Sequence, residues 1–291
     1  MQDESAVMRQ LRRFGFEAKA WAMRRFHCPV GADALVLEVG SGGNPYPRAN
    51  VLLDAYETTR ERHWAPLSAD RPTVLGFVEN LPFRDQAFDF VIAAHVLEHS
   101  TQPEQFLSEL QRVARAGYIE VPDAFLERVN PYRDHRLEIT CRDETLLIRK
   151  KSSWRPEEEV VELYEDRVKS VMTRSLVPRH PFEFHVRYYW ENKIAYRVIN
   201  PEVDAAWAPP ESAPHGGAAG GLRAQVRDFL RWGLSQRRRN AGVALDPLLR
   251  CPTCHGVNLT RSSELIACTQ CNTVYPVRRG IPVMNEGRPR D

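Results

Sequence analysis

Four clustered cysteines have the spacing that a metal site requires. Two C-x-x-C pairs lie 13 residues apart near the end of the chain, and their members are Cys251, Cys254, Cys268 and Cys271. Two thiolates from each pair can complete a tetrahedral Zn²⁺ site, and four sulfur ligands leave no position open for catalysis. The other two cysteines stand alone. This pattern predicts a structural zinc ribbon rather than disulfides.

A glycine-rich turn is the second group with chemical meaning. Glu38, Gly40 and Gly42 belong to the run LEVGSGGNP, which follows an apolar segment. Glycine lets a backbone approach a ligand closely, and such a turn after a first strand holds nucleotide-type ligands. Asp54 ends the next apolar run and is placed to accept hydrogen bonds from ribose hydroxyls. A dinucleotide fingerprint would need G-x-G-x-x-G and an acid about 20 residues on, and the chain meets neither spacing.

Short apolar runs alternate with other segments from residue 35 to 122. Five runs suit buried strands: 35–39, 51–54, 73–77, 88–94 and 117–121. Residues 103–114 carry apolar side chains at helical spacing, which predicts an amphipathic helix. This order is typical of an α/β fold with a Rossmann-like, doubly wound, mostly parallel sheet.

Further motifs identify a resemblance. An L-P-F loop at 81–83, an F-D-F-V strand start at 88–91 and the run His95-Val96-Leu97-Glu98-His99 follow the glycine turn. Together they make segment 35–122 resemble class I S-adenosylmethionine-dependent methyltransferases of the ubiquinone/menaquinone-biosynthesis type. The resemblance implies binding roles for Glu38, Gly40 and Gly42 at the methionine part, Asp54 at the ribose, Leu81 beside the adenine loop and His95 at the end of the fourth strand.

Two departures from that family concern the cofactor site. Only ten residues separate Gly43 from Asp54, so the first helix must be very short or irregular. Phe77 stands where relatives often carry an aspartate, and Glu79 is the candidate to replace that carboxylate at the adenine.

Histidines are the candidate bases if the acceptor is a hydroxyl. His95 and His99 lie in the motif, while His135 and His185 lie further along the chain; a positioned base typically adds ~10²–10⁴-fold in rate. In some relatives of the resembled family, carboxylates and a histidine at the turn His95-x-x-Glu98-His99 bind a divalent metal. Because the first position here is histidine, a hydrogen-bonded turn is the favoured interpretation.

The C-terminal segment carries a second resemblance. Residues 250–285 resemble the small zinc-ribbon activator subunit of tRNA, rRNA and release-factor methyltransferases. The resemblance implies that the ribbon docks by strand addition, on its own catalytic domain or a neighbour's, and the apolar run 281–284 could supply that strand. The alternative is an unrelated ribbon with another partner.

The remaining segments complete a three-part organisation. We predict a methyltransferase domain at 1–207, a linker and basic helix at 208–249, and the ribbon at 250–291. Within the first part we expect a helix in 1–27, an inserted region at about 133–180 with a hairpin at 137–150 and a helix at 157–176, and a second hairpin at 182–199.

Charge and segment composition leave the acceptor open. Residues 208–291 hold 12 Arg, no Lys and 6 acids, which leaves 28 basic and 32 acidic residues in the remainder. A small-molecule or glycan-type acceptor is favoured, an RNA acceptor is the alternative, and a non-catalytic scaffold is the third hypothesis. Because no run is long and apolar enough for a membrane span and no signal peptide is evident, we expect a cytoplasmic protein.

Overall fold

The computed structural model describes residues 2–59, 61, 66–165, 168–209 and 233–290. The chain divides into two compact units that are each made of several segments. The first unit contains Met1–Pro29, Ala93–Glu104 and Gly117–Ser212, and the second contains Val30–Ile92, Gln105–Ala116 and Ala213–Asp291. Strand β4 (Phe90–Ala94) contributes residues to both units.

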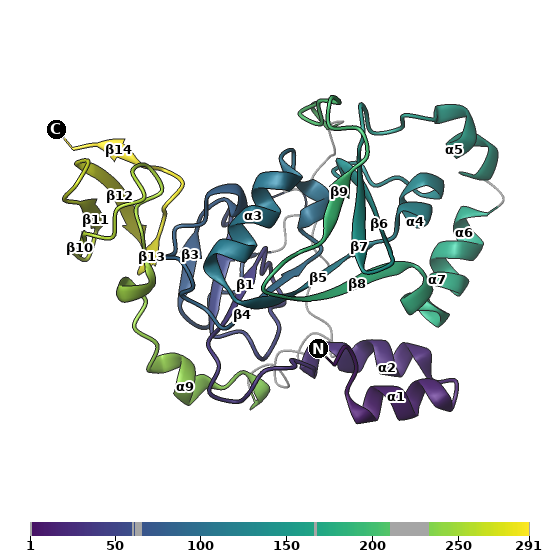
Figure 1. Ribbon diagram of the computed structural model, residues 1–291, viewed down its shortest axis with the longest axis horizontal. Coiled ribbons are helices and arrows are strands. Elements are labelled where there is room, and N and C mark those ends of the chain that lie inside the picture. Colours follow the sequence, from purple (N-terminus) through teal and green to yellow (C-terminus); the bar gives the residue numbers. More distant parts are fainter. Residues whose placement is uncertain (1, 60, 62–65, 166–167, 210–232, 291) are drawn as a thin grey trace. The chain divides into compact units, whose positions relative to one another are not determined.

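The second unit is built on parallel strands in the order β3-β2-β1-β4 (Figure 1). Their bounds are β1 (Val36–Val39), β2 (Val51–Asp54) and β3 (Thr73–Leu75), followed by β4. Strand β1 pairs in parallel with β2, and β2 with β3. Every residue of these three strands is buried, as expected for parallel strands that are covered on both faces. The predicted mostly parallel sheet is confirmed.

The connection between β1 and β2 contains no helix. Residues 40–50, all of which the structure describes, form turns and bends. The short glycine-to-aspartate spacing predicted a very short or irregular helix, and the structure has no helix in this connection. Helix α3 (Pro103–Val113) and the short 3₁₀ helix η3 (Val78–Asn80) are the regular elements beside the strands, and α3 buries Phe106, Leu107, Leu110 and Val113.

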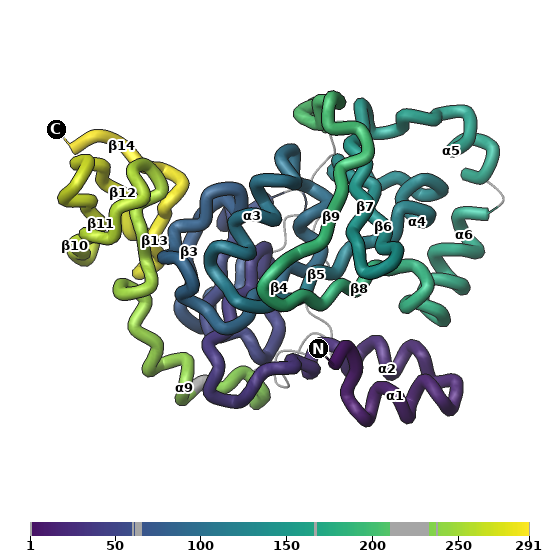
Figure 2. Tube along the Cα trace, in the orientation of Figure 1, coloured from purple at the N-terminus to yellow at the C-terminus, as the bar shows by residue number. Residues whose placement is uncertain are grey.

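The four cysteines lie in a small antiparallel module, which we call the four-cysteine module (residues 250–290). Its elements are β10 (Leu259–Arg261), β11 (Leu265–Cys268), β12 (Thr273–Arg278), β13 (Ile281–Pro282) and β14 (Arg288–Pro289). Directly after β13, Val283 forms a parallel bridge with Leu75, and the Met284 N–H donates to the Leu75 carbonyl at 2.7 Å. Figure 2 shows the yellow end of the chain beside β3 at this point. The module thus extends the sheet edge of its own chain.

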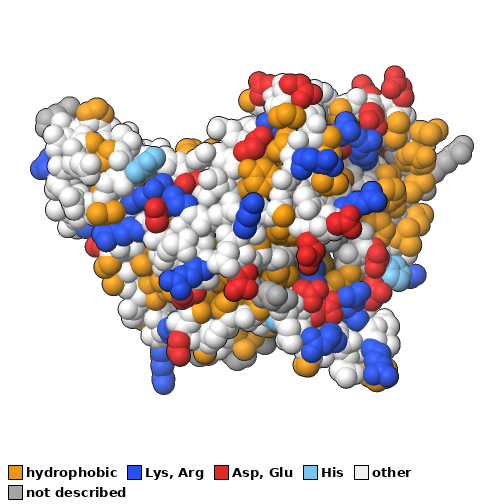
Figure 3. Space-filling view, viewed as in Figure 1, with side chains coloured by type: hydrophobic (Ala, Val, Ile, Leu, Met, Phe, Trp, Pro, Cys, Tyr) orange, Lys and Arg blue, Asp and Glu red, His pale blue; other side chains and the backbone are white. Residues whose placement is uncertain are grey.

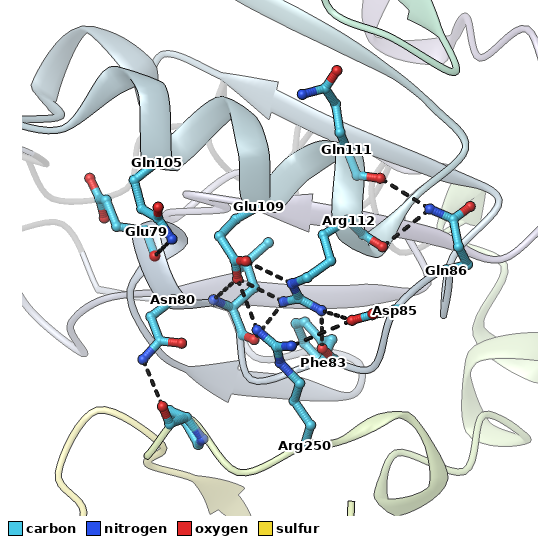
Figure 4. A network of polar contacts seen from close by, with 12 residues as sticks. Glu79, Asn80, Phe83, Asp85, Gln86, Gln105, Glu109, Gln111, Arg112 and Arg250 are labelled. Atoms are coloured by element: carbon cyan, nitrogen blue, oxygen red, sulfur yellow. Dashed lines mark hydrogen bonds and ion pairs between the residues drawn. The ribbon is translucent and has the colours of Figure 1, made fainter. Parts of the chain in front are cut away.

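A second attachment precedes the first cysteine. The Arg250 N–H donates to the Pro82 carbonyl at 3.0 Å, and Arg250 lies 3.6 Å from Glu109 and 3.4 Å from Asp85. Figure 4 shows Arg250 and Arg112 converging on Glu109. Because Glu109 is only 5% exposed, the two guanidinium groups neutralise a buried carboxylate. Helix α9 (Arg237–Ala241) and the 3₁₀ helix η7 (Asp246–Leu248) lead into this attachment.

The first unit combines two β-structures with short helices. In the strand order of the larger sheet, β4 is followed by β5 (Ala116–Pro122) and then by β8 (His185–Glu191). A separate three-stranded sheet consists of β6 (Leu137–Arg142), β7 (Thr145–Lys150) and β9 (Tyr196–Val198). Its helical elements are α1 (Ala6–Arg13), α2 (Glu17–Met23), η1 (Arg24–Phe26), η4 (Leu97–His99), α4 (Ala124–Val129), α5 (Glu158–Glu165), α6 (Lys169–Val171), the π-helix η5 (Met172–Leu176), α7 (Val177–Arg179) and η6 (Pro181–Glu183). The hairpin predicted at 137–150 is confirmed, with its turn between Arg142 and Thr145.

Three expectations for this unit need correction. The predicted single helix in 1–27 is divided into α1 and α2, because Gly15 has φ of +76° and ends the first helix. The predicted hairpin at 182–199 does not form: β8 adjoins β5, whereas β9 pairs in parallel with β7. The segment predicted as one helix at 157–176 contains three shorter elements, α5, α6 and η5, in the part that the structure describes.

Part of the predicted linker and basic helix lies outside the described residues, which exclude 210–232. Of the expected basic helix, only residues from 233 onward are described; they do not form one continuous helix, because residues 235 and 236 are non-helical and α9 begins at Arg237. Among the described helices, none has the length and apolar character to cross a membrane.

The β3–Val283 pairing makes a stability prediction. Val283 is fully buried, so Val283→Asp loses about 1.5–3 kcal/mol of apolar burial and also buries a carboxylate. We expect the free energy of unfolding, measured by urea denaturation, to fall by more than about 2 kcal/mol. The control Leu265→Asp, on β11 at 36% exposure, should change it by less than about 1 kcal/mol. Equal effects of the two substitutions would contradict a role for this pairing.

Candidate functional site

The glycine turn in the second unit is fixed to the end of the neighbouring strand. Gly40 and Gly42 have positive φ values of 63° and 58°, a region that residues with a Cβ rarely adopt. The Gly42 N–H donates to Asp54 Oδ2 at 2.9 Å, and the Ser41 N–H donates to the Leu53 carbonyl at 3.1 Å. Asp54 Oδ1 also accepts the Tyr56 N–H at 3.2 Å. One carboxylate therefore organises the turn after β1 and the turn after β2.

Glu38 supports the same turn from within β1. Its side chain is buried, and Oε2 accepts the Tyr46 N–H at 2.7 Å. This bond ties the strand to the helix-free connection that follows it. The structure thus brings together Glu38, Gly40, Gly42 and Asp54, the four residues expected at the methionine and ribose parts.

The two residues expected near the adenine have different surroundings. Leu81 is fully buried, and its N–H donates to Glu109 Oε2 at 2.7 Å, so the side chain belongs to the core. Glu79 is partly exposed, and its carbonyl accepts a hydrogen bond from Gln105 at 3.1 Å (Figure 4).

An exposed aromatic pair, which was not predicted from the sequence, lies near this loop. Tyr56 follows β2 and Phe77 follows β3; they are 47% and 42% exposed, and their ring centroids are 6.0 Å apart. Phe77 was noted only for the aspartate that it replaces. The available signal was that each aromatic residue stands two positions after a strand, at the carboxyl edge of a parallel sheet, where ligands of such sheets bind.

In the first unit, a buried carboxylate gathers partners from three segments. Glu120 on β5 is fully buried and accepts two hydrogen bonds from Arg24, at 2.7 and 2.8 Å. His95 Nε2 lies 3.0 Å from the same carboxylate, and the Tyr118 hydroxyl also donates to it. Burial alone would raise the pKa of Glu120, but the hydrogen bonds and charges of His95 and Arg24 hold it well below its usual value.

The Glu120 carboxylate strongly affects the protonation of His95. Burial alone would lower the pKa of His95, but the hydrogen bond to Glu120 and the negative charge of Glu98 raise it well above its usual value, although 44% of the side chain remains exposed. These contacts favour the protonated form of His95, which makes the ring a poor proton acceptor at neutral pH. Its φ of +56° is a further constraint, because such a conformation is uncommon for residues with a Cβ.

His185 has the properties that a base needs. Its Nδ1 donates to the Pro181 carbonyl at 2.9 Å, which leaves Nε2 as the proton acceptor of the neutral ring. Burial, partly opposed by that hydrogen bond, lowers the pKa of His185, and the nearby His95 cation lowers it further. Its ring lies 5.7 Å from that of His95 and 4.8 Å from that of Trp21.

Two further histidines belong to a separate buried group. His99 and His135 lie edge to face with ring centroids 4.8 Å apart, next to Glu98, which is 2% exposed. His135 Nδ1 lies 2.7 Å from Glu127 Oε2, and Lys151 Nζ donates to Glu127 Oε1 at 2.8 Å. All of these residues belong to the first unit.

The four cysteines meet the geometric requirement for one metal ion. Their sulfur atoms all lie within 4.8 Å of one another, with Cys251 and Cys271 at 3.7 Å and Cys254 and Cys268 at 3.5 Å. Sulfur atoms that bind one zinc at about 2.3 Å are spaced by roughly 4 Å. The residues therefore fit a tetrahedral Zn²⁺.

One family model matches part of the chain. Residues 37–119 match the family model described as a methyltransferase domain, and the match includes the glycine turn, β2 and the first residues of β5. A curated relative, an uncharacterized protein of Methanocaldococcus jannaschii, is 26% identical over 102 residues, which is 35% of this chain. The chain spans about half of that relative, 48% of its length.

Solved structures show limited likeness. An S-adenosylmethionine-dependent methyltransferase of Mesorhizobium loti is 14% identical over 43% of this chain and 60% of its own, with a TM-score of 0.30. A Haloferax volcanii complex of the Trm112 methyltransferase activator with a proposed methyltransferase is 17% identical over 47% and 79%, with a TM-score of 0.28. At such scores these structures add no argument to the family match.

The ion pair of Glu120 predicts a pH-dependent stability. Removing one partner of a buried pair costs about 3–5 kcal/mol, so Glu120→Gln should lower the free energy of unfolding by about 3 kcal/mol at pH 7. Because the folded-state pKa of Glu120 is lowered from 4.5, its contribution is fully present above that pH and is lost as the pH falls below it. Denaturant titrations of both proteins between pH 7 and pH 3 measure the difference, which should shrink on acidification.

The matched control for this prediction is Glu157→Gln. Glu157 lies 3.3 Å from Arg128, and their side chains are 48% and 40% exposed. An exposed pair contributes at most about 1 kcal/mol. A pH-independent effect of Glu120→Gln, or one no larger than the control, would contradict the buried ion pair.

Proposed function

We propose that the chain transfers a methyl group from S-adenosylmethionine to a small-molecule or glycan-type acceptor. The observation that carries the proposal is the bond between the glycine turn and Asp54, inside a segment that matches the methyltransferase-domain model. A turn held open by positive-φ glycines suits close approach of a ligand. The same intact turn argues against a non-catalytic scaffold.

The proposed cofactor site uses the residues at the ends of β1, β2 and β3. Gly40 and Gly42 would contact the methionine part, with Glu38 fixing the turn, and Asp54 would accept the ribose hydroxyls. We assign the adenine to Tyr56 and Phe77, because two exposed aromatic rings offer apolar faces to a flat heterocycle. Glu79 and Leu81 would then help to hold the loop beside the adenine through their backbone hydrogen bonds to Gln105 and Glu109.

The bound cofactor supplies a methyl group on a sulfonium, which needs chiefly an aligned nucleophile. For a hydroxyl acceptor, the S–CH₃ bond breaks as the O–CH₃ bond forms, and the hydroxyl proton must leave. We assign that proton to Nε2 of His185, because His95 is held as a cation. His95 would instead stabilise negative charge on the acceptor, and His99 belongs to the buried group beside Glu98.

Asp54→Asn tests the cofactor site directly. The substitution keeps the shape but removes the charge that the Gly42 N–H and the ribose hydroxyls require. Hydrogen bonds to a charged group contribute about 1.5–3 kcal/mol, so S-adenosylhomocysteine should bind roughly 10–100-fold more weakly by calorimetry. The control Asp70→Asn, at a residue paired with Arg71 before β3, should bind as the wild type does. Unchanged binding by Asp54→Asn would remove the proposed site.

A labelling experiment with the wild type and two variants tests the acceptor class. Methyl-labelled S-adenosylmethionine and fractionated cell extract are incubated with wild type, Asp54→Asn and His185→Gln. Label in small molecules or glycans with the wild type alone supports the proposal, and His185→Gln should lose transfer while still binding S-adenosylhomocysteine. Label in RNA alone would replace the proposed acceptor, and no label in any fraction would favour the scaffold.

RNA is the second candidate because of a basic groove on the four-cysteine module. A groove of about 390 Å³ is lined by nine residues that include Arg261, Arg288 and Arg290 but no acid. On the face shown in Figure 3, Lys and Arg side chains gather at the border between this module and the neighbouring strands. Such a surface suits phosphates, although Arg261 also pairs with Asp246 at 2.8 Å.

We further propose that the four-cysteine module holds one structural Zn²⁺ and stabilises the sheet edge on which it lies. Metal analysis should find one zinc per chain, and Cys268→Ser should lose it together with the folded module, because small zinc-bound modules fold through their metal. The control Cys141→Ser, at an isolated cysteine of β6, should retain zinc. A zinc-free wild type that keeps its melting temperature would contradict both statements.

A further inference from the structure

Glu98 is a buried carboxylate without the hydrogen bonds that burial normally requires. It is 2% exposed, and among the described residues neither of its oxygens accepts a hydrogen bond. The nearest ring nitrogens are His95 Nδ1 at 3.4 Å and His135 Nε2 at 4.0 Å from Oε1. A buried polar atom without a partner is costly, and an ion that binds there is one established explanation.

Two imidazoles lie beside this carboxylate with suitable orientation. One ligand atom each from Glu98, His99 and His135 lie within 4.8 Å of one another. His99 Nδ1 lies 3.1 Å from the Asp134 carbonyl, which can only accept, and His135 Nδ1 lies 2.7 Å from Glu127. Both contacts place the proton of the neutral ring on Nδ1 and make Nε2 the metal-binding atom, as in proteins whose metal-binding imidazoles are oriented by an outer partner.

The group differs from the motif that the sequence suggested. His95 lies outside it, because its Nε2 pairs with Glu120 at 3.0 Å. His135, which follows α4, takes the third place instead. The structure therefore replaces the consecutive motif by one carboxylate and two imidazoles from separate segments, with Glu127 and Lys151 as the outer partners of one imidazole.

We propose that Glu98, His99 and His135 form a binding site for one divalent transition-metal ion. Ligands at about 2.0–2.2 Å from one ion lie up to roughly 4 Å apart, so the three atoms need to approach slightly on binding. Imidazole ligands suit Zn²⁺, Fe²⁺, Ni²⁺ or Cu²⁺, whereas Mg²⁺ prefers oxygen ligands and retained water. Mg²⁺ should therefore not compete.

Three protein ligands leave coordination positions open, and this part of the inference rests on the proposed function. An acceptor oxygen on the ion would be oriented and would lose its proton more readily. The acceptor class is then narrowed to molecules with an oxygen donor that can bind such an ion, for example paired hydroxyls. A buried structural ion would instead need a fourth protein ligand.

The test uses the full chain with its cysteine site first loaded with Zn²⁺. Equilibrium dialysis against Co²⁺, with metals counted by mass spectrometry, should give one Co²⁺ per chain in addition to the zinc. The absence of cobalt–thiolate absorption shows that the cysteines have not exchanged their metal. An excess of Mg²⁺ should leave the Co²⁺ content unchanged, and displacement by Mg²⁺ would overturn the assignment to a transition metal.

Variants locate the ion. His99→Gln and His135→Gln should each lose the bound Co²⁺, while Glu127→Gln, which changes only a positioning residue, should weaken binding about 10–100-fold. The control His180→Ala removes an imidazole of the same unit whose side chain is 51% exposed and should bind Co²⁺ normally. Because His99 is less buried than His135, its variant keeps the test valid if His135→Gln unfolds.

Two results would overturn the site: no Co²⁺ beyond the zinc in the wild type, or undiminished Co²⁺ in both histidine variants. S-adenosylhomocysteine binding is measured on the same samples. Protein that binds S-adenosylhomocysteine but no Co²⁺ contradicts the metal site alone. Protein that binds Co²⁺ but no S-adenosylhomocysteine contradicts the proposed function alone.

Discussion

The first unit depends on the need to neutralise one buried carboxylate. Glu120 lies in the middle of β5 without solvent exposure, and a lone buried charge would cost several kcal/mol. Arg24 from the N-terminal segment, Tyr118 from the same strand and His95 from the end of β4 share its two oxygens. The 3₁₀ helix η1, a strand end and a histidine in an uncommon backbone conformation thus all contact a single charge.

In the second unit, too, one carboxylate holds several segments together: Asp54 connects two turns. Its two oxygens accept backbone N–H groups from Gly42 and Tyr56, so the aspartate expected at a ribose also determines the shape of the glycine turn. The residue that we propose for the ribose therefore has an architectural role as well. Glu38 also has an architectural role, because its carboxylate accepts the Tyr46 N–H and holds the connection after β1.

Local patterns were sufficient for some elements and insufficient for others. The strand ending at Asp54 and the hairpin at 137–150 were predictable because alternation, burial and turn residues lie within one short segment. The separation of β8 from β9 was not, because adjacent strands with a tight turn between them normally pair, and here each finds a better partner far along the chain. For the site, the glycine turn was visible as a motif, whereas the grouping of His135 with Glu98 depends on a fold that brings distant segments together. The protonation of His95 likewise depends on Glu120, 25 residues later.

The pairing of Val283 with Leu75 has a consequence for how the chain behaves among others. Strand β3 is the last strand of its sheet, and an exposed strand edge is a template on which unrelated chains can add and aggregate. Here the edge is paired with Val283 and Met284 of the same polypeptide, which are present at a high effective concentration because they are covalently connected. Protection of the edge therefore does not vary with the abundance of any second protein, and it arises only after the C-terminal residues have been synthesised.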